Sequence, residues 1–284
     1  MALILNGSTQ SAIGATVQPI AAKPFTLSAW IKSTSVAASQ SVVAYGDGSN
    51  DIYLLQARGA IVGDPIAAME YDGAWKIADT SSGFSAGTWH HVAATFVGDT
   101  ERNSFIDGGS KGTNTDSQSA DIDGAFRIRV GTHSGSAGFF AGKIASVAMW
   151  SSELSDANIL LLANGSVPSD IEAGTLEGYW PLLNNYEDSS ANENDLQGVG
   201  EPTFDATDNP LVTYSELTGT IAAVSAVTGN IVSTIYSSLT GTIAAVSTVG
   251  PSSLGSTTVG LTVETVFIKR LVAAGNDQIY YEAI

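Results

Sequence analysis

The stretch of residues 89–109 constrains the fold of this chain more than any other. Residues 89–96 alternate as a strand does, with two sets of side chains facing opposite ways: Trp89, His91, Ala93 and Thr95 on one face, and His90, Val92, Ala94 and Phe96 on the other. Asp107 and Gly108 follow the next apolar run and are typical of a tight hairpin turn, because both tolerate positive φ. The stretch therefore predicts antiparallel strands joined by tight turns.

This pattern resembles the central hairpin of the laminin-G-like, concanavalin-A-like jelly-roll family, in which a Gly-x-Trp-x-His-Val-Ala strand leads into a strand ending in Asp-Gly. Further segments look like the family's other elements in the same order: residues 25–32 (early buried strand), 139–150 (late strand), 155–159 (short helix), 178–182 (closing strand) and 188–190 (its loop). The resemblance covers residues 2–211. It implies an all-β, two-sheet jelly-roll sandwich with one short helix near residues 155–163.

The composition agrees with a β protein rich in turns, and the absence of cysteine excludes disulfides and thiolate metal sites. Residues 1–7 lack the basic and long apolar regions of a secretory signal peptide, and Leu3–Leu5 look like the first strand. No uninterrupted apolar stretch is long enough to span a bilayer. A domain of this usually extracellular family without a leader would be released by another route, such as lysis with a phage particle, unless a leader was trimmed.

The chain is strongly acidic, with a net charge of −17. Residues 1–214 carry 24 acidic and 9 basic side chains, so the expected sandwich holds most of this charge. An acidic surface opposes binding to nucleic acid and to anionic lipid. We therefore expect neither nucleic acid nor membrane as a partner, while solubility and cation binding are favoured.

A second region begins after the turn-rich residues 205–210. Nine residues, 217–225, recur without change at 239–247, which is an internal repeat of 22 residues. β-Branched residues and glycines favour two short strands per unit over a helix. Ile221, Val224 and Val227 recur at three-residue steps, so a helix stays open as the alternative. We expect residues 212–284 to form a small repetitive β-rich region.

This second region has small side chains and few aromatic anchors, so it would bury only a thin core alone. Repeats of this kind usually stack on neighbours or on other chains. We expect the region to order through oligomerisation, with a trimer favoured, or by docking on a larger assembly. Residues 261–270 and 278–281 look like a terminal hairpin, and the Leu-x-Gly-Thr-Ile-Ala repeats look like those of phage and marine metagenomic proteins.

No catalytic residue is expected. A retaining glycosidase needs two carboxyls about 5–5.5 Å apart, and the expected strand pattern of a sandwich glycosidase, Glu-x-Asp-x-x-Glu, is absent. Glu193 and Asp195 come nearest, but they lie in a segment typical of a loop, and Asp121 and Asp123 end in a turn signal. His90 and His91 belong to the family-typical strand, where a structural role is favoured over that of a catalytic base.

The resemblance also implies a Ca²⁺ site, made by Asp-Gly-x-x-Asp near the start and an Asp after the late strand's Gly-x-Ile. This chain departs from that pattern, because the three places hold Asn6, Gln10 and Ala145. Fewer carboxylates weaken the binding of a hard divalent cation. We therefore expect no cofactor and leave Ca²⁺ open, with four aspartates as candidate ligands of a different site: Asp47, Asp51, Asp121 and Asp123.

A glycan site would need exposed aromatic rings beside polar loops. Four tryptophans fall within apolar strand patterns and are expected in the core: Trp30, Trp89, Trp150 and Trp180. Tyr71 and Trp75 differ, because they flank an Asp-Gly turn, and they are the candidate ligand-facing pair. His133 lies in a Gly- and Ser-rich turn and is a third candidate contact, although a bland surface role is favoured there.

The sequence therefore predicts a non-enzymatic structural protein of a phage virion: a capsid decoration, head-fibre or tail-associated protein assembled in the host cytoplasm. Its expected partners are copies of itself and other virion proteins. The alternative is a carbohydrate-binding adhesin or lectin-like module of a cell surface, with glycans as partners. A glycosidase is the third reading.

Overall fold

The computed structural model describes residues 1–15, 19–48, 51–122, 126–208 and 210, and four short strands between residues 238 and 280. The chain divides into two units, Met1–Leu211 and Val212–Ile284, and each is described by itself. In the second unit, β16 (Ser238–Leu239) pairs with β17 (Val266–Phe267), and β18 (Val272–Ala274) with β19 (Gln278–Tyr280), all antiparallel. The repeated segments 217–225 and 240–247 lie outside the described residues.

One layer of the first unit is an eight-stranded sheet. Its strand order is β10-β9-β8-β3-β12-β1-β15, and β13 also pairs with β12. The bounds of its strands are β1 (Ala2–Asn6), β3 (Phe25–Ser33), β8 (His90–Gly98), β9 (Glu101–Ile106), β10 (Gly109–Asn114), β12 (Ala141–Trp150), β13 (Leu176–Trp180) and β15 (Thr203–Asp205). Every pairing in it is antiparallel.

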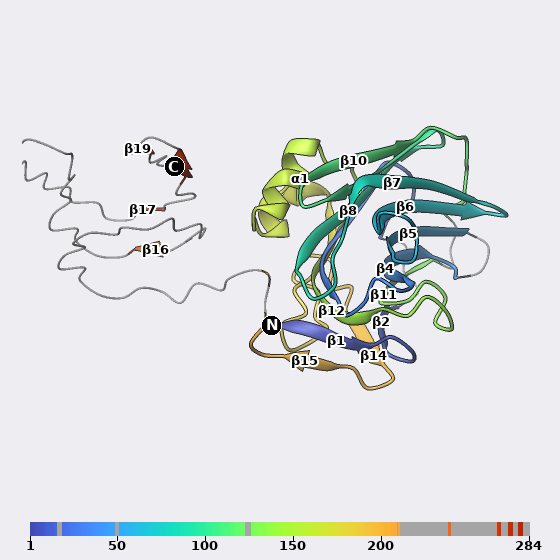
Figure 1. Ribbon diagram of the computed structural model, residues 1–284, viewed down its shortest axis with the longest axis horizontal. Coiled ribbons are helices and arrows are strands. Elements are labelled where there is room, and N and C mark those ends of the chain that lie inside the picture. The colour runs from blue at the N-terminus through green and yellow to red at the C-terminus, as the bar shows by residue number, and fades with distance from the viewer. Residues whose placement is uncertain are drawn as a thin grey trace, which may run out of the picture. The chain divides into compact units, whose positions relative to one another are not determined.

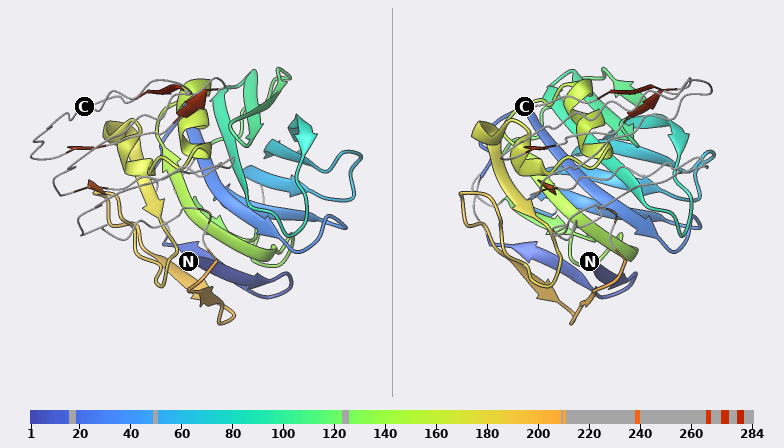
Figure 2. Two further views of the ribbon diagram at one scale, coloured as in Figure 1. Left: turned by 60° about the vertical axis from the view of Figure 1, so that its left-hand side comes forward. Right: turned by 90° about the vertical axis from the view of Figure 1, so that its left-hand side faces the viewer.

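The other layer is a seven-stranded antiparallel sheet of order β14-β2-β11-β4-β5-β6-β7. The bounds of its strands are β2 (Ser11–Gly14), β4 (Ser39–Gly46), β5 (Asp51–Arg58), β6 (Pro65–Asp72), β7 (Trp75–Gly83), β11 (Arg127–Val130) and β14 (Leu196–Val199). Figures 1 and 2 show the two sheets as the two layers of a sandwich, which confirms the predicted jelly roll.

The main core fills the space between the sheets, and its centre is a group of aromatic rings. Phe25 stacks on Phe96 with ring centroids 4.8 Å apart, and its edge meets Tyr53 at 4.9 Å. The hydroxyl of Tyr45 donates to the Ile20 carbonyl at 2.6 Å, so this buried polar group is satisfied. The alternation seen in the sequence holds, because Phe96 faces this core.

A second core covers part of the outer face of the eight-stranded sheet. The predicted helix is present as α1 (Asp156–Ala163), and the hydroxyl of Ser155 caps it by accepting from the Asn158 backbone N–H. Ile159 and Leu162 of α1 pack around Trp150. Two short 3₁₀ helices follow, η1 (Pro168–Asp170) and η2 (Ala173–Thr175). None of the described helices is long and apolar enough to cross a membrane.

The four tryptophans that were expected in the core differ in how deeply they are buried. Trp150 and Trp180 are fully buried, as predicted. For Trp30 and Trp89 the prediction is wrong, because both are only half-buried. They lie on the outer face of the eight-stranded sheet, beyond the cluster that α1 packs into.

The Asp107–Gly108 hairpin forms as predicted, between β9 and β10. Both residues have positive φ, 50° and 75°, which is the conformation that this residue pair tolerates. A side chain at Gly108 would also collide with Leu160 of α1, so glycine serves the packing here as well as the turn.

Candidate functional site

Tyr71 and Trp75 lie directly opposite each other where β6 turns into β7. Their positions pair across the two strands, and their ring centroids are 4.9 Å apart with an interplanar angle of 47°. Gly73 takes a φ of 72° in the turn between them. Both side chains are half-buried, so each presents part of its ring to solvent.

The pair belongs to the outer face of the seven-stranded sheet, the face turned away from the main core. One row of cross-strand partners runs over all seven strands of this face: Gln197, Ile13, Arg129, Ala44, Leu54, Met69 and Ile77. The middle of the face is closely packed and apolar, because Ile52, Leu54 and Met69 form a cluster of buried residues against which Tyr71 and Trp75 pack. The two aromatic rings are thus supported from below by buried apolar side chains.

Arginines add charge to the outer face. Arg58 pairs with Asp79 across two strands, with Nη1 and Oδ2 2.5 Å apart. Arg129 is 6% exposed, and its guanidinium donates to the Gly46 carbonyl at 2.8 Å and to the Asp47 carbonyl at 3.2 Å. Arg127 lies two residues before Arg129 on the same strand, so both point to this face.

His133 reaches the same face from the loop after β11. Its Nδ1 lies 2.9 Å from the hydroxyl of Ser41, whose cross-strand partner is Gln56 on the outer face. Burial, and then the charge of Arg129, lower the pKa of His133, so the imidazole is neutral at neutral pH. The loop is as predicted, but His133 is half-buried rather than an open surface residue.

The structure therefore brings all three predicted ligand contacts to one face, but not to one point. Ser41 is three strands and four residues away from Trp75, which corresponds to about 20 Å on a sheet. Tyr71 and Trp75 form one contact area, and His133 belongs to another with Arg129.

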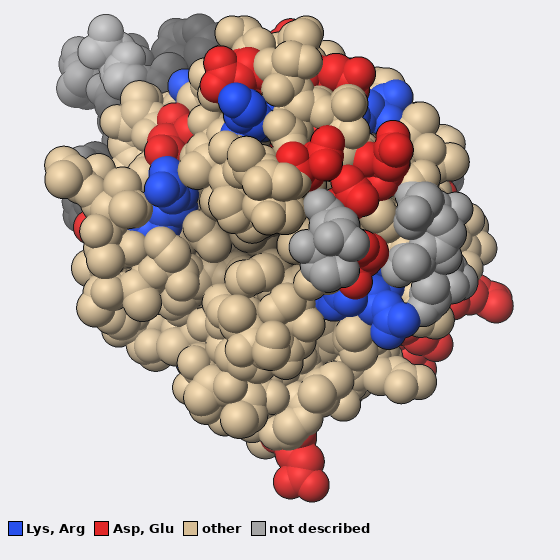
Figure 3. Space-filling model, turned by 90° about the vertical axis from the view of Figure 1, so that its right-hand side faces the viewer, with Lys and Arg blue, Asp and Glu red and all other residues tan. Residues whose placement is uncertain are grey.

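Three of the four candidate metal ligands come together at one end of the sandwich. The backbone N–H of Asp121 donates to Asp51 Oδ1 at 3.2 Å, and the N–H of Asp51 donates to Asp47 Oδ1 at 3.2 Å. Burial raises the pKa of Asp51, and the charges of Asp47, Asp72 and Asp121 raise it further. Figure 3 shows the side of the molecule on which β5 and β6 lie in Figure 1. Charged side chains gather in the upper part of this view, and a broad area without charged side chains lies below them.

Carboxylate oxygens of Asp47 and Asp51 thus accept hydrogen bonds from backbone N–H groups. Within the described residues, no group of three or more His, Asp or Glu side chains is arranged to hold a metal ion. Asp123 lies outside the described residues. At the family position, Asn6 Oδ1 accepts from the backbone N–H groups of Ser8, Thr9 and Gln10, so its oxygen closes a turn. Ca²⁺ binding stays a prediction to be measured.

The profile of the "Concanavalin A-like lectin/glucanases superfamily" matches residues 6–160, more than half of the chain. The chain belongs to this superfamily. No curated protein matches it.

Two solved structures illustrate the fold of this superfamily. Domain 4 of the extracellular arabinanase AbnA from Geobacillus stearothermophilus, solved with arabinotriose, is 20% identical, with a TM-score of 0.50 over 57% of this chain and 76% of that one. A candidate carbohydrate-binding protein from Bacteroides ovatus is 17% identical, with a TM-score of 0.50 over 72% of this chain and 60% of that one. At these identities the likeness shows the fold.

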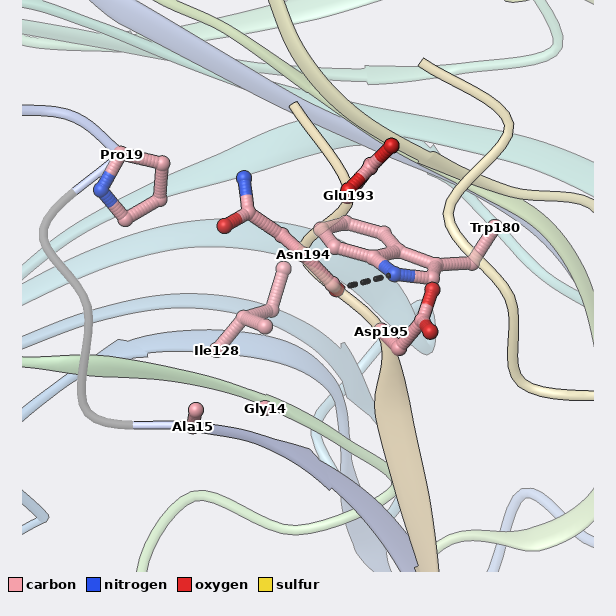
Figure 4. A pocket seen from close by; sticks show the side chains of 8 residues that line it. All are labelled: Gly14, Ala15, Pro19, Ile128, Trp180, Glu193, Asn194 and Asp195. Atoms are coloured by element: carbon pink, nitrogen blue, oxygen red, sulfur yellow. Dashed lines mark hydrogen bonds between the residues drawn. The ribbon is translucent and has the colours of Figure 1, made fainter. Parts of the chain in front are cut away.

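This member of the concanavalin A-like superfamily also has a pocket of about 230 Å³ near Trp180. Its lining residues are Gly14, Ala15, Pro19, Ile128, Trp180, Glu193, Asn194 and Asp195 (Figure 4). The Trp180 indole donates to the Asn194 carbonyl at 2.8 Å, and Asp195 Oδ1 accepts from the Asp188 backbone N–H at 2.8 Å. These hydrogen bonds stabilise the segment that contains Asn194 and Asp195. The segment is a loop, as predicted.

The two histidines of β8 take local roles in this jelly roll. His90 Nδ1 lies 2.7 Å from Asp107 Oδ2, and its Nε2 accepts from the Ser85 backbone N–H at 3.1 Å. His91 is 1% exposed, and its Nδ1 has no hydrogen-bond partner among the residues that the structure describes. Burial lowers the pKa of His91 to about 4, so the ring is neutral inside the protein.

Sequence reasoning missed the arginines of the outer face. The signal that could have found them is the alternation Arg127-Ile128-Arg129-Val130, which places both arginines on the face opposite the buried Ile128 and Val130. Arg58 gives no such signal, because its partner Asp79 is 21 residues away and becomes a neighbour only through the strand order.

Proposed function

We propose that this protein binds carbohydrate without catalysing a reaction, and that the site is the outer face of the seven-stranded sheet. The observation that carries this proposal is the Tyr71–Trp75 pair, two half-buried rings 4.9 Å apart on an apolar base. Sugar rings present C–H groups that pack on aromatic faces, and few polar groups suffice to orient them. The two relatives named above support the choice of ligand, since one was solved with arabinotriose.

The polar groups around the pair suit a sugar. Asp79 is exposed and pairs with the half-buried Arg58, so an acceptor and a donor stand side by side on the face. His133 supplies a neutral imidazole further along the sheet. Such donors and acceptors can replace the water bound to sugar hydroxyls, while the rings supply most of the contact area.

A non-enzymatic role fits the placement of carboxylates on this face. Hydrolysis by retention requires two carboxyl groups about 5–5.5 Å apart. Strand alternation in the seven described strands puts one carboxylate on the outer face, Asp79, and it is engaged with Arg58. The face can therefore contact and orient a sugar, but the described strands place no second carboxylate on it that could act together with Asp79.

The test compares Trp75 with Trp30, a half-buried tryptophan on the opposite sheet. Affinity electrophoresis of the full chain in gels that contain soluble polysaccharides first identifies a polysaccharide that retards the protein. Trp75→Ala should then weaken binding about tenfold or more, the loss typical of a central aromatic contact. Trp30→Ala, on the other sheet, should bind like the unaltered protein. The proposal fails if no polysaccharide is retained, or if Trp75→Ala binds as well as Trp30→Ala.

We also propose that the protein serves as a structural part of a phage virion, as a decoration, head-fibre or tail-associated protein. The 22-residue repeat of residues 217–225 and 239–247 supports this, because such repeats commonly stack on copies from other chains. Carbohydrate binding by the first unit would then serve attachment to a host surface.

Light scattering tests the assembly role. The full chain should form a trimer or larger species, and a chain ending at Leu211 should be a monomer. Two monomers would remove the repeat as an assembly module and leave the carbohydrate-binding proposal standing alone.

A further inference from the structure

Three side chains from different parts of the chain form a line of hydrogen bonds at the start of β8. His90 lies in the middle, with its Nδ1 2.7 Å from Oδ2 of Asp107 and its Nε2 3.1 Å from the hydroxyl oxygen of Ser85. Ser85 belongs to the loop between β7 and β8, which joins the two sheets, and Asp107 belongs to the hairpin turn between β9 and β10. The fold therefore brings a hydroxyl, an imidazole and a carboxylate together in that order.

Asp107 determines which nitrogen of His90 carries the proton. A carboxylate only accepts hydrogen bonds, so the neutral imidazole donates to it from Nδ1. The other oxygen of Asp107, Oδ1, accepts from the His91 backbone N–H at 3.0 Å, which holds the carboxylate in place. Nε2 of His90 is then the unprotonated nitrogen and accepts from the Ser85 hydroxyl. In this arrangement an imidazole acts as a general base toward a serine.

The loop that carries Ser85 is fixed on both sides of the serine. Phe84 is buried, and the backbone N–H groups of Phe84 and Gly87 donate to carbonyl groups elsewhere in the chain at 3.0 Å and 2.8 Å. Ser85 itself is exposed, whereas the His90 side chain is only 12% exposed. A Cβ atom added at Gly87 would meet no atom within 4 Å, so a reagent has room beside the serine.

A second pair of a hydroxyl and an imidazole lacks two of these features. Nδ1 of His133 lies 2.9 Å from the Ser41 hydroxyl, but Ser41 is fully buried. Within the part of the chain that the structure describes, no carboxylate is hydrogen-bonded to His133. Ser41 therefore serves as an internal comparison for the reactivity of Ser85.

We propose that Ser85 is a modification site, a nucleophilic serine that takes up one acyl group per chain from an activated ester. The Ser85 oxygen forms a bond to the acyl carbon, and its proton passes to Nε2 of His90. The bond between the acyl carbon and the oxygen of the leaving alcohol then breaks, and the alcohol leaves with the proton from His90. The products are the serine ester and a free alcohol. This inference goes beyond the proposed carbohydrate binding, which uses the outer face of the seven-stranded sheet.

The same geometry limits how fast this serine reacts. The backbone N–H of Ser85 donates to Nε2 of His90 at 3.1 Å, so it points toward the base and away from the oxygen of an incoming acyl group. Serine hydrolases use backbone N–H donors to stabilise that oxygen, and the loss of one such donor costs about 10²–10³ in rate. We therefore expect the acceleration that a general base supplies alone, about 10²–10⁴ over an ordinary serine.

The test measures how fast an alkyl fluorophosphonate labels the full chain, with phosphorus in place of the acyl carbon and fluoride as the leaving group. Mass spectrometry of the intact chain and of its peptides should find one phosphonyl group, on Ser85. Labelling should be about a hundredfold or more faster than at an exposed serine without a histidine, such as Ser8, and Ser41 should stay unlabelled. Ser85→Ala should abolish the fast labelling, and His90→Gln should slow it about a hundredfold. Ser8→Ala should leave it unchanged.

Asp107 acts through His90, so it is a positioning residue with a readout of its own. Asparagine tolerates the φ of 50° at this position, so Asp107→Asn should keep the turn and the urea midpoint. Its amide oxygen would accept from the His91 N–H, which leaves the amide nitrogen facing Nδ1 of His90. The proton of the imidazole would then move to Nε2, and labelling of Ser85 should slow about tenfold or more.

The outcomes are distinct from those of the carbohydrate-binding test. Labelling of Ser85 no faster than that of Ser8 would overturn this inference, as would fast labelling that survives in His90→Gln. Unchanged labelling in Asp107→Asn would overturn the part assigned to the carboxylate. Tryptophan fluorescence during urea unfolding checks that each variant is folded. None of these results changes what Trp75→Ala is expected to do to polysaccharide binding.

Discussion

The indole nitrogen of Trp89 donates a hydrogen bond of 2.7 Å to Oδ1 of Asp208, which lies 119 residues later in the chain. The other carboxylate oxygen of Asp208 accepts from Lys32 at 2.9 Å and from Lys143 at 2.6 Å. Lys143 also reaches Asp205 at 2.7 Å. The end of the first unit is thus fastened to the outer face of the eight-stranded sheet by a network of charged hydrogen bonds.

Asp208→Ala should lower the free energy of unfolding of the first unit by about 1 kcal/mol, because three charged hydrogen bonds are lost at a partly exposed site. All five tryptophans lie in this unit, so their fluorescence during urea unfolding reports on it alone. Asp170→Ala, which removes an exposed carboxylate elsewhere, is the control and should change little.

The same network sets a dependence on acid. The hydrogen bond with Lys143 holds the pKa of Asp208 and of Asp205 well below its usual range. A carboxyl with a lowered folded-state pKa stabilises the fold above its unfolded pKa, near 4, and loses this effect as the pH falls toward the folded value. The difference in stability between the unaltered protein and Asp208→Ala should therefore shrink below about pH 4. A difference that grows in acid would contradict this account.

His91 should make the jelly roll sensitive to mild acid. Burial lowers its pKa to about 4, whereas in the unfolded chain it titrates near 6.5. Between these two pH values His91 is protonated in the unfolded chain and neutral in the folded chain. The free energy of unfolding therefore falls as the pH drops from about 6.5 to about 4, by up to about 3 kcal/mol. His91→Phe removes this titration and keeps a ring beside Trp30, whose centroid is 5.5 Å away.

The measurement is urea unfolding at about pH 7 and about pH 5, followed by tryptophan fluorescence. The unaltered protein should lose more stability between the two conditions than His91→Phe does. Equal losses would mean that His91 is solvated or protonated in the folded protein.

Much of the fold could be predicted from local sequence. The Asp107–Gly108 turn and the alternation of residues 89–96 depend on neighbouring residues only, and both are present. The burial of Trp30 and Trp89 could not be predicted in this way. Strand alternation tells which side chains share a face, but α1 covers only part of that face, and this depends on how distant elements pack.

The candidate site shows the same limit. Tyr71 and Trp75 were found because the turn that joins them is local. His133 and Arg129 lie on the same sheet face as Tyr71 and Trp75 because the strand order is β11-β4-β5-β6-β7. β11 is 55 residues beyond the end of β6, and no local pattern encodes that order.

Calcium should leave the stability of the first unit unchanged. Amides replace two family carboxylates, and the described residues hold no group of three acids or histidines arranged for a metal. Ligand binding stabilises a fold in proportion to the logarithm of ligand over Kd. Millimolar Ca²⁺ or a chelator should therefore shift Tm by less than about 1 °C.

A larger shift would favour the alternative site at Asp47, Asp51 and Asp121. Asp51→Asn should then abolish the shift, whereas Asp170→Asn should keep it. A Ca²⁺-dependent shift that survives in Asp51→Asn would assign the ion to residues other than these.

Glu70 and Arg102 form a buried ion pair whose two members should be strongly coupled. Both side chains are fully buried, with Arg102 Nε 3.2 Å from Glu70 Oε2, and Lys23 Nζ is 2.7 Å from the other oxygen. Glu70 also accepts from the Ala120 backbone N–H at 3.2 Å. Removing one partner leaves a buried charge unpaired, so Glu70→Gln and Arg102→Met should each cost about 3 kcal/mol or more.

The double variant decides between a coupled pair and two independent contacts. Because the second substitution removes the charge that the first left unpaired, the double variant should be less destabilised than the sum of the singles by about 1–3 kcal/mol. Urea unfolding of the four chains, followed by tryptophan fluorescence, gives this coupling directly. Additive losses would mean that Lys23, which also lies 2.9 Å from Asp99, supplies the main charge for Glu70, and that Arg102 is held chiefly by the backbone carbonyls it meets.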